Sequence, residues 1–218
     1  MGCEGNSFLR LSTLKISAFV LLTLYAGDAW ARETYVQLAN RLVATAETQQ
    51  ALAPGIEAAL LRLVNAHRLS IGRKPLKDAP DLQLAARAQA ADLQGQGRVG
   101  HVSSGGQDFD SRMRALPGGV LVLPSMAENA ARVSKADGDD DALARRLMAQ
   151  WLSSPPHKHE LESADYIAVA TGVVHSKGQV YADQIFVGAE VQTNMNSTIQ
   201  PAPVVVPKPK KQSGQGLY

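Results

Sequence analysis

The stretch IAVATGVVHSKGQVYADQIFVGAEV, residues 167–191, decides the fold class of this chain. It holds two apolar runs rich in β-branched residues, Ile167–His175 and Gln179–Val191, which are separated by Ser176-Lys177-Gly178. Such runs on either side of a short, glycine-containing segment are typical of two antiparallel strands joined by a tight loop. The sequence therefore predicts a β-hairpin with a three-residue loop near the end of the domain.

The segments that precede this hairpin have the periodicity of helices. Their apolar residues recur every three to four positions, which places them on one face of an α-helix. The predicted helices are Glu33–Leu52, Ile56–Ile71, a helix with the stripe Leu82–Leu93 that Asp78 or Asp81 caps, Phe109–Leu116, and a helix that buries Leu143, Leu147 and Trp151 and is capped within Gly138–Asp141. Glu128–Ala131 is expected to be a short strand or an irregular extended segment. Helices first and a hairpin last predict an α+β fold with an antiparallel sheet.

The first 31 residues have the composition of a secretory signal peptide. Arg10 and Lys15 precede the apolar run Ile16–Ala26, and Ala29-Trp30-Ala31 matches a small-residue cleavage site. A helix that spans a bilayer needs about 20 apolar residues, and this run is shorter. We therefore expect cleavage near Ala31 and secretion to the extracellular space or periplasm, with no permanent membrane span afterwards. The alternative is an uncleaved N-terminal anchor.

Cysteine and charge exclude several classes of protein. The single cysteine, Cys3, lies in the leader, so the sequence excludes an intrachain disulfide, a cysteine-based zinc ribbon and an iron–sulfur cluster. The chain has 218 residues and a net charge of +2, but residues 32–191 carry only −1, which does not favour nucleic-acid binding. Residues 192–218 contain three lysines, several prolines and no acidic residue. This tail is predicted to be disordered, either as an inert linker or as a segment that attracts anionic polymers or membranes.

Several short motifs, taken in order, resemble one known family. They are Val64-Asn65-x-x-Arg68-x-x-x-Gly72-x-x-Pro75-Leu76, Gly100-His101, Ala127-Glu128-Asn129, Trp151-x-Ser153-Ser154-Pro155-x-His157, Thr171-Gly172-Val173, and Tyr181-x-x-Gln184-x-Phe186 with Gly188. Their order and spacing over Glu57–Gly188 are similar to the CAP superfamily, which comprises cysteine-rich secretory proteins, antigen 5 and plant pathogenesis-related proteins. The family is also called the SCP domain, and the fourth motif resembles its bacterial form.

The resemblance implies an α-β-α sandwich, with a small antiparallel sheet between helical layers. Together with the leader, the first predicted helix and the tail described above, it divides the chain into a signal peptide (1–31), a helical N-terminal extension (32–54), a CAP domain (55–191) and the Pro/Lys-rich tail (192–218). It also implies a surface cleft lined by two histidines and two glutamates. His101 and His157 match the histidines and Glu128 matches one glutamate. Ser154 stands where the animal and plant members have the second glutamate, so the expected set lacks one carboxylate.

Two imidazoles in one cleft form a candidate metal site. Neutral histidine nitrogens bind divalent transition metals, and zinc (Zn²⁺) is the first expectation for His101 and His157. Glu128 would be a third ligand or would hold a bound water, and a metal-bound water with Glu128 as the base would give a hydrolase. The alternative is a polar cleft without a tightly held metal, in which these side chains fix loops by hydrogen bonds.

Three functions remain open at this point. The first is a secreted binding protein whose cleft recognises a ligand, either a lipid, another cell-envelope component or a divalent cation, by analogy with family members that bind sterols or other lipids. The second is a metal-dependent hydrolase that uses the same residues. The third is a structural or interaction domain with a vestigial cleft. No catalytic residue is assigned, and the sequence names neither the ligand nor the oligomeric state.

Overall fold

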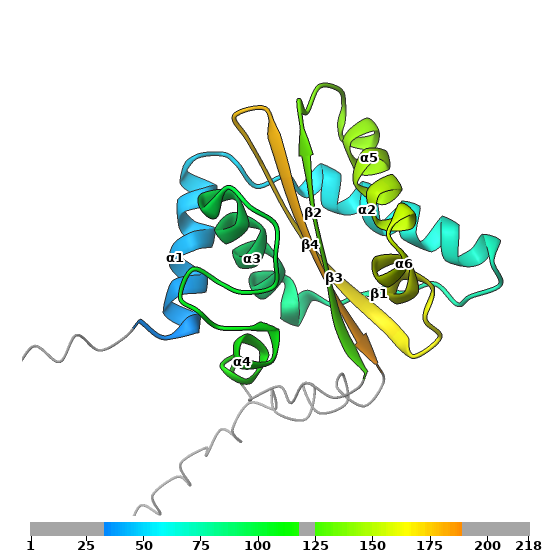
Figure 1. Ribbon diagram of the computed structural model, residues 1–218, viewed down its shortest axis with the longest axis horizontal. Helices are drawn as coiled ribbons and strands as arrows, with labels where there is room; N and C mark the ends of the chain where they lie inside the picture. Colours follow the sequence, from blue (N-terminus) through cyan, green and yellow to red (C-terminus); the bar gives the residue numbers. More distant parts are fainter. Residues whose placement is uncertain (1–32, 118–124, 189–218) are drawn as a thin grey trace, which may run out of the picture. The chain divides into compact units, whose positions relative to one another are not determined.

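The computed structural model describes residues 33–117 and 125–188 (Figure 1). The helices are α1 (Tyr35–Thr48), α2 (Pro54–Ser70), α3 (Gln83–Gln96), α4 (Phe109–Arg114), α5 (Asp140–Ser153) and α6 (Pro155–Glu162), with a 3₁₀ turn, η1, at Pro80–Leu82. The strands are β1 (Lys77–Asp78), β2 (Met126–Ser134), β3 (Tyr166–Ser176) and β4 (Gln179–Gly188). The predicted signal peptide and tail lie outside the described residues. No helix among those described is long and apolar enough to cross a membrane.

The helix caps are predicted correctly at one helix and wrongly at another. The Asp139 side chain accepts a hydrogen bond from the Ala142 amide at 2.7 Å, which confirms the predicted acidic cap of α5. The N-cap of α3 is Leu82, whose side chain makes no capping bond, so neither Asp78 nor Asp81 caps this helix. The physical reason is that η1, which begins at Pro80, leads directly into α3 and separates both aspartates from its first turn.

The four strands form one mixed sheet in the order β1-β3-β4-β2. β4 pairs antiparallel with both β3 and β2, as the hairpin predicts. β1 is parallel to β3, with Lys77 opposite Ala168 and Asp78 opposite Val169, so the expectation of a purely antiparallel sheet is wrong in this one short strand. The chain that leaves α2 runs along β3 for two residues before it turns into η1, and the Ala79 amide adds a bond to the Val169 carbonyl.

The loop of the hairpin is shorter than predicted. Ser176 and Gln179 are directly paired, so only Lys177 and Gly178 connect the strands. Both residues have positive φ, 53° and 67°, which is the conformation of a type I′ turn. The twist of that turn matches the twist of the two strands, which explains why Ser176 stays in the ladder.

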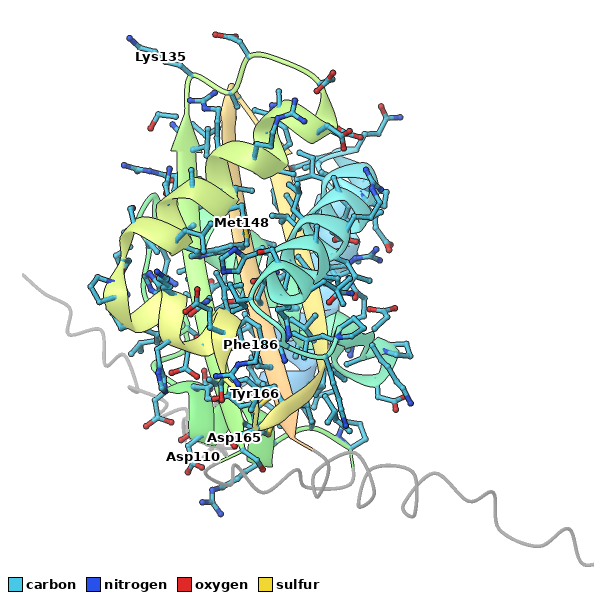
Figure 2. The ribbon with its side chains drawn as sticks, turned by 90° about the vertical axis from the view of Figure 1, so that its right-hand side faces the viewer. Asp110, Lys135, Met148, Asp165, Tyr166 and Phe186 are labelled. Carbon is cyan, nitrogen blue, oxygen red and sulfur yellow. The ribbon has the colours of Figure 1, made fainter. Side chains whose placement is uncertain are left out.

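Helices cover both faces of the sheet (Figure 1). α2, α5 and α6 cover one face, where Trp151 of α5 is fully buried and the rings of Tyr166 and Phe186 are 5.4 Å apart (Figure 2). α1, α3 and α4 cover the other face. Tyr35 and Leu38 of α1 are buried in the core of that second face, so the helix predicted as an extension contributes to the core of the sandwich.

Candidate functional site

The site is built on β2, which pairs only with β4 among the described strands and therefore forms one edge of the sheet. Successive side chains of a strand point to opposite faces. Glu128 points toward the layer that contains α4, where it contacts Arg112. Asn129 points toward the opposite layer, where its amide donates to the His157 carbonyl of α6 at 3.0 Å. Two neighbouring residues thus hold groups on both sides of the sheet edge.

Glu128 lies between a buried arginine and a half-exposed histidine. Its Oε1 accepts a hydrogen bond from Nη2 of Arg112 at 2.6 Å, and its Oε2 lies 2.8 Å from Nδ1 of His101. The Arg112 and Glu128 side chains are 0% and 2% exposed, whereas that of His101 is 52% exposed. The carboxylate therefore fixes the orientation of the imidazole and leaves its Nε2 on the side away from Glu128, available to a ligand.

Hydrogen bonds hold the loop that contains His101 against α3. Gln89 donates to the Gly100 carbonyl at 3.2 Å, and Asp92 accepts from the Ser104 amide at 2.5 Å. Arg112 also donates to the His101 carbonyl at 3.3 Å. The main chain is thus held on both sides of His101, which reduces the freedom of the imidazole further.

His157 lies on the first turn of α6, within electrostatic reach of His101. Partial burial and then the charge of His101 lower the pKa of His157 below its usual value. The structure therefore joins His101 to Glu128 by a hydrogen bond and places His157 near enough for the charge of His101 to act on its imidazole. Ser154 lies between α5 and α6, where its carbonyl accepts from the Lys158 amide at 2.8 Å, and its side chain makes no capping bond.

Three buried residues near Glu128, which the sequence analysis did not select, also belong to the site. They are Tyr35 of α1, Arg112 of α4 and Asp183 of β4. Both Asp183 oxygens, the Tyr35 hydroxyl, and Nε and Nη1 of Arg112 are buried with no hydrogen-bond partner among the described residues. A group of buried polar atoms on an otherwise apolar face costs folding free energy, and such groups are found preferentially at functional sites.

The charges within this buried group are coupled. Burial and then the charge of Glu128 raise the pKa of Asp183 well above its usual range, although Arg112 opposes the shift. Burial by itself lowers the pKa of Arg112, but the charges of Glu128 and Asp183 outweigh it and the net shift is upward. Burial also raises the pKa of Tyr35 to about 12. Arg112 is therefore a permanent cation, and Asp183 keeps its proton to higher pH than an exposed aspartate does.

We expect the pKa values of the two histidines of the site to be shifted in opposite directions from the usual value of 6.5. The hydrogen bond to Glu128 raises the pKa of His101, against burial and the charge of Arg112, whereas the pKa of His157 is lowered. NMR titration of the imidazole signals checks this order, and Glu128→Gln should lower the pKa of His101. The contact between His101 and Glu128 contributes its full stabilisation of the fold below about pH 6.5. This contribution is lost as the pH rises through the raised pKa of His101. A pKa of His101 at or below that of His157 would contradict the geometry.

The donor set does not fit a resident zinc ion. Among residues 33–117 and 125–188, no group of three or more His, Cys, Asp or Glu side chains is placed to share a metal. Both oxygens of Glu128 are already engaged, so the protein offers two imidazoles, whereas zinc sites in enzymes have three protein ligands. Neutral His157 and Nε2 of His101 could at most hold a cation that keeps other ligands.

Several solved bacterial structures are similar to part of this chain. Among solved structures, an extracellular SCP-domain protein from Bacillus anthracis is similar to the chain with a TM-score of 0.48 and 18% identity, over 62% of this chain and 41% of that one. A cysteine-rich secretory protein from Staphylococcus aureus gives 0.45 and 21%, over 62% and 38%. An outer surface protein from Borrelia burgdorferi gives 0.46 and 17%, over 59% and 89%. The chain thus spans less than half the length of the first two proteins.

The family assignment rests on the sequence profile. A search of curated proteins gives no match. The profile described as CAP, the cysteine-rich secretory protein family, matches residues 61–189, which is more than half of the chain and includes His101, Glu128 and His157. The chain belongs to the CAP family of cysteine-rich secretory proteins.

Proposed function

We propose that this CAP domain is a secreted binding protein whose cleft at the β2 edge recognises the polar head group of a lipid or another cell-envelope component. Secretion is supported by the leader, with its apolar run and the small-residue motif Ala29-Trp30-Ala31. The observation that supports recognition is the chain of contacts from Arg112 through Glu128 to His101, which fixes a half-exposed imidazole beside His157.

The two imidazoles offer different chemistry to a ligand. Near pH 6.5 the raised pKa keeps His101 cationic, so its Nε2 is a charged donor. The lowered pKa keeps His157 neutral, so it has one donor and one acceptor nitrogen. A carboxylate can accept from the charged donor, and a neighbouring hydroxyl can bond to the neutral ring. A head group that carries both groups therefore suits this cleft.

The hydrolase alternative requires a different environment for Glu128. As the base for a water, its carboxylate would need access to that water. Its side chain is 2% exposed, and its two oxygens are engaged by Arg112 and His101. The same geometry suits a carboxylate that orients a histidine, so it favours binding over hydrolysis by Glu128.

Binding to three defined probes tests the proposal. The probes are sodium decanoate, a soluble muramyl dipeptide and Zn²⁺, each titrated into the isotope-labelled protein while the imidazole signals are followed by NMR. We expect decanoate or the dipeptide to shift the His101 and His157 signals. His101→Ala should weaken that binding by about tenfold or more, because a charged hydrogen bond is lost.

His159→Ala is the matched control, because His159 lies on the same helix and is exposed. It should change binding by less than about twofold, as expected for a surface position outside the cleft. Binding of Zn²⁺ alone, lost in His101→Ala and His157→Ala, would replace head-group recognition by cation binding. If no probe moves either signal, or if His159→Ala weakens binding as much as His101→Ala, the proposal is wrong.

A further inference from the structure

A polar pocket lies away from the β2 edge, between the loop that follows α2 and the first residues of β3. Its volume is about 550 Å³, which is within the range of small-molecule sites. Its lining includes four cationic side chains, Arg68, Arg73, Lys74 and Lys77, and several apolar ones, among them Pro75, Ala164 and Ile167. The lining includes no carboxylate side chain.

Arg68 is the buried part of this pocket. It is 1% exposed, and its Nε donates to the Lys74 carbonyl at 2.9 Å. Its Nη1 donates to the carbonyls of Leu161 and Ser163 at 2.8 and 2.9 Å. Its Nη2 makes no hydrogen bond with the described residues, and Arg68 belongs to the lining of the pocket. The structure thus holds one guanidinium nitrogen ready for a ligand.

The positive charge here lacks a carboxylate partner. Burial and then the charge of Arg73 lower the pKa of Arg68, and no acidic side chain opposes that shift. Across the described residues, none of the four cations makes an ion pair with an aspartate or glutamate. A buried charge without a counter-charge is costly, so an anion that enters the pocket is favoured electrostatically.

Acidic residues nearby have other contacts. Glu162 pairs with His67 at 2.8 Å, while its carbonyl accepts from Nε of Arg73. Asp78 lines a different pocket on the other side of β1. Asp165 precedes Tyr166 in the chain but is not part of the lining (Figure 2). The pocket therefore keeps its positive character.

The apolar part of the lining indicates what the anion is attached to. Ile167 is 36% exposed although most of β3 is buried, and Pro75 is exposed in the loop between Lys74 and Lys77. A ligand that is only an inorganic anion would leave both residues in water. A short apolar stem on the anion would cover them and gain the free energy of burying apolar surface.

We propose that this pocket binds a phosphate monoester that carries a short apolar chain. A phosphate has about −1.5 to −2 charges at pH 7 and three acceptor oxygens, so it can meet several separate cations at once. Arg68 Nη2 supplies a fixed donor, and Lys74 and Lys77 supply mobile ones. A carboxylate, with one charge and two oxygens, would leave more of these donors unpaired.

Calorimetric titration with hexyl phosphate tests the proposal directly. We expect hexyl phosphate to bind at least about threefold more tightly than inorganic phosphate, because only the ester covers the apolar residues. The double substitution Lys74→Gln and Lys77→Gln should weaken this binding by about tenfold or more. Both lysines are exposed and their side chains make no hydrogen bond with the described residues, so the fold should be retained.

The control removes the same charge elsewhere. Lys135 and Arg145 are exposed, and Lys135 lies at the opposite end of the sheet from Tyr166 (Figure 2). Lys135→Gln with Arg145→Gln should change the affinity by less than about twofold. Phosphatidylcholine vesicles with and without phosphatidic acid identify the source: binding to the anionic vesicles, lost in the Lys74/Lys77 variant, would support a lipid head group.

Binding of hexyl phosphate without vesicle binding would support a soluble ester instead. Absence of binding to both probes, or equal weakening by the two double variants, would overturn the proposal. His101→Ala should leave the titration unchanged, so this result is independent of the function proposed for the β2 edge.

Discussion

Gly172→Ala is expected to destabilise the domain by at least about 3 kcal/mol, at the upper end of the cost of overpacking a core. Gly172 lies in the middle of β3, where α3 crosses the sheet. A Cβ at this position would lie 2.2 Å from the Ala86 carbonyl carbon and from the Arg87 nitrogen, and 2.3 Å from the Ala86 oxygen. These are backbone atoms of a helix, so the contact can be relieved only if α3 moves away from the sheet.

Urea denaturation of the variant checks this result, and Gly95→Ala is its matched control. Gly95 lies near the end of the same helix, and a Cβ there meets no atom within 4 Å. Alanine has the higher helix propensity, so Gly95→Ala should be neutral or stabilising by up to about 1 kcal/mol. A loss of less than about 1 kcal/mol for Gly172→Ala would mean that α3 does not pack as closely on β3 as the structure shows.

The long elements of this fold could be predicted because their patterns are repeated over many residues. Apolar residues at helical spacing, such as Leu147 and Trp151, recur over the whole of α5, and the hairpin has two long apolar runs. β1 has neither property, because Lys77 and Asp78 are two exposed, charged residues whose strand pairing comes only from the position of β3. The length of the hairpin loop depended on whether Ser176 stayed paired, which composition does not specify.

In the candidate site, too, some residues could be predicted from the sequence and others could not. His101, Glu128 and His157 were selected because short motifs resemble a family, while the sequence separation between them gave no geometry. Arg112 was missed because nothing in a short helix distinguishes a buried arginine from an exposed one. Asp183 carried a usable signal, since it interrupts an apolar strand at a position that shares a face with Ile185. An aspartate on such a face either keeps its proton or has a cationic partner, so its presence there indicates a buried polar site.

Arg112→Met is expected to cost about 3–5 kcal/mol of folding free energy, because it leaves the buried carboxylate of Glu128 without its cation. Arg112 is 0% exposed and holds both Glu128 Oε1 and the His101 carbonyl. Its charge also lowers the pKa of His101. In the folded fraction of the variant, the pKa of His101 should therefore rise further, a change that lost packing alone would not produce.

Two comparison variants separate the charge effect from the packing effect. Arg114→Met removes the same side chain two residues later on α4, from an exposed pair with Asp110, and should cost no more than about 0.5 kcal/mol.

Asp183→Asn should be tolerated far better than Arg112→Met, because the raised pKa of Asp183 favours the neutral carboxyl group that asparagine resembles. That raised pKa also means that stability falls as the pH rises from about 3.9 toward the folded-state pKa, and Asp183→Asn should remove this slope. Denaturation of all three variants between pH 4 and pH 8 gives the comparison. If Asp183→Asn is as costly as Arg112→Met, Asp183 is ionised in the folded domain, and Arg112 then balances two carboxylates behind His101 rather than one.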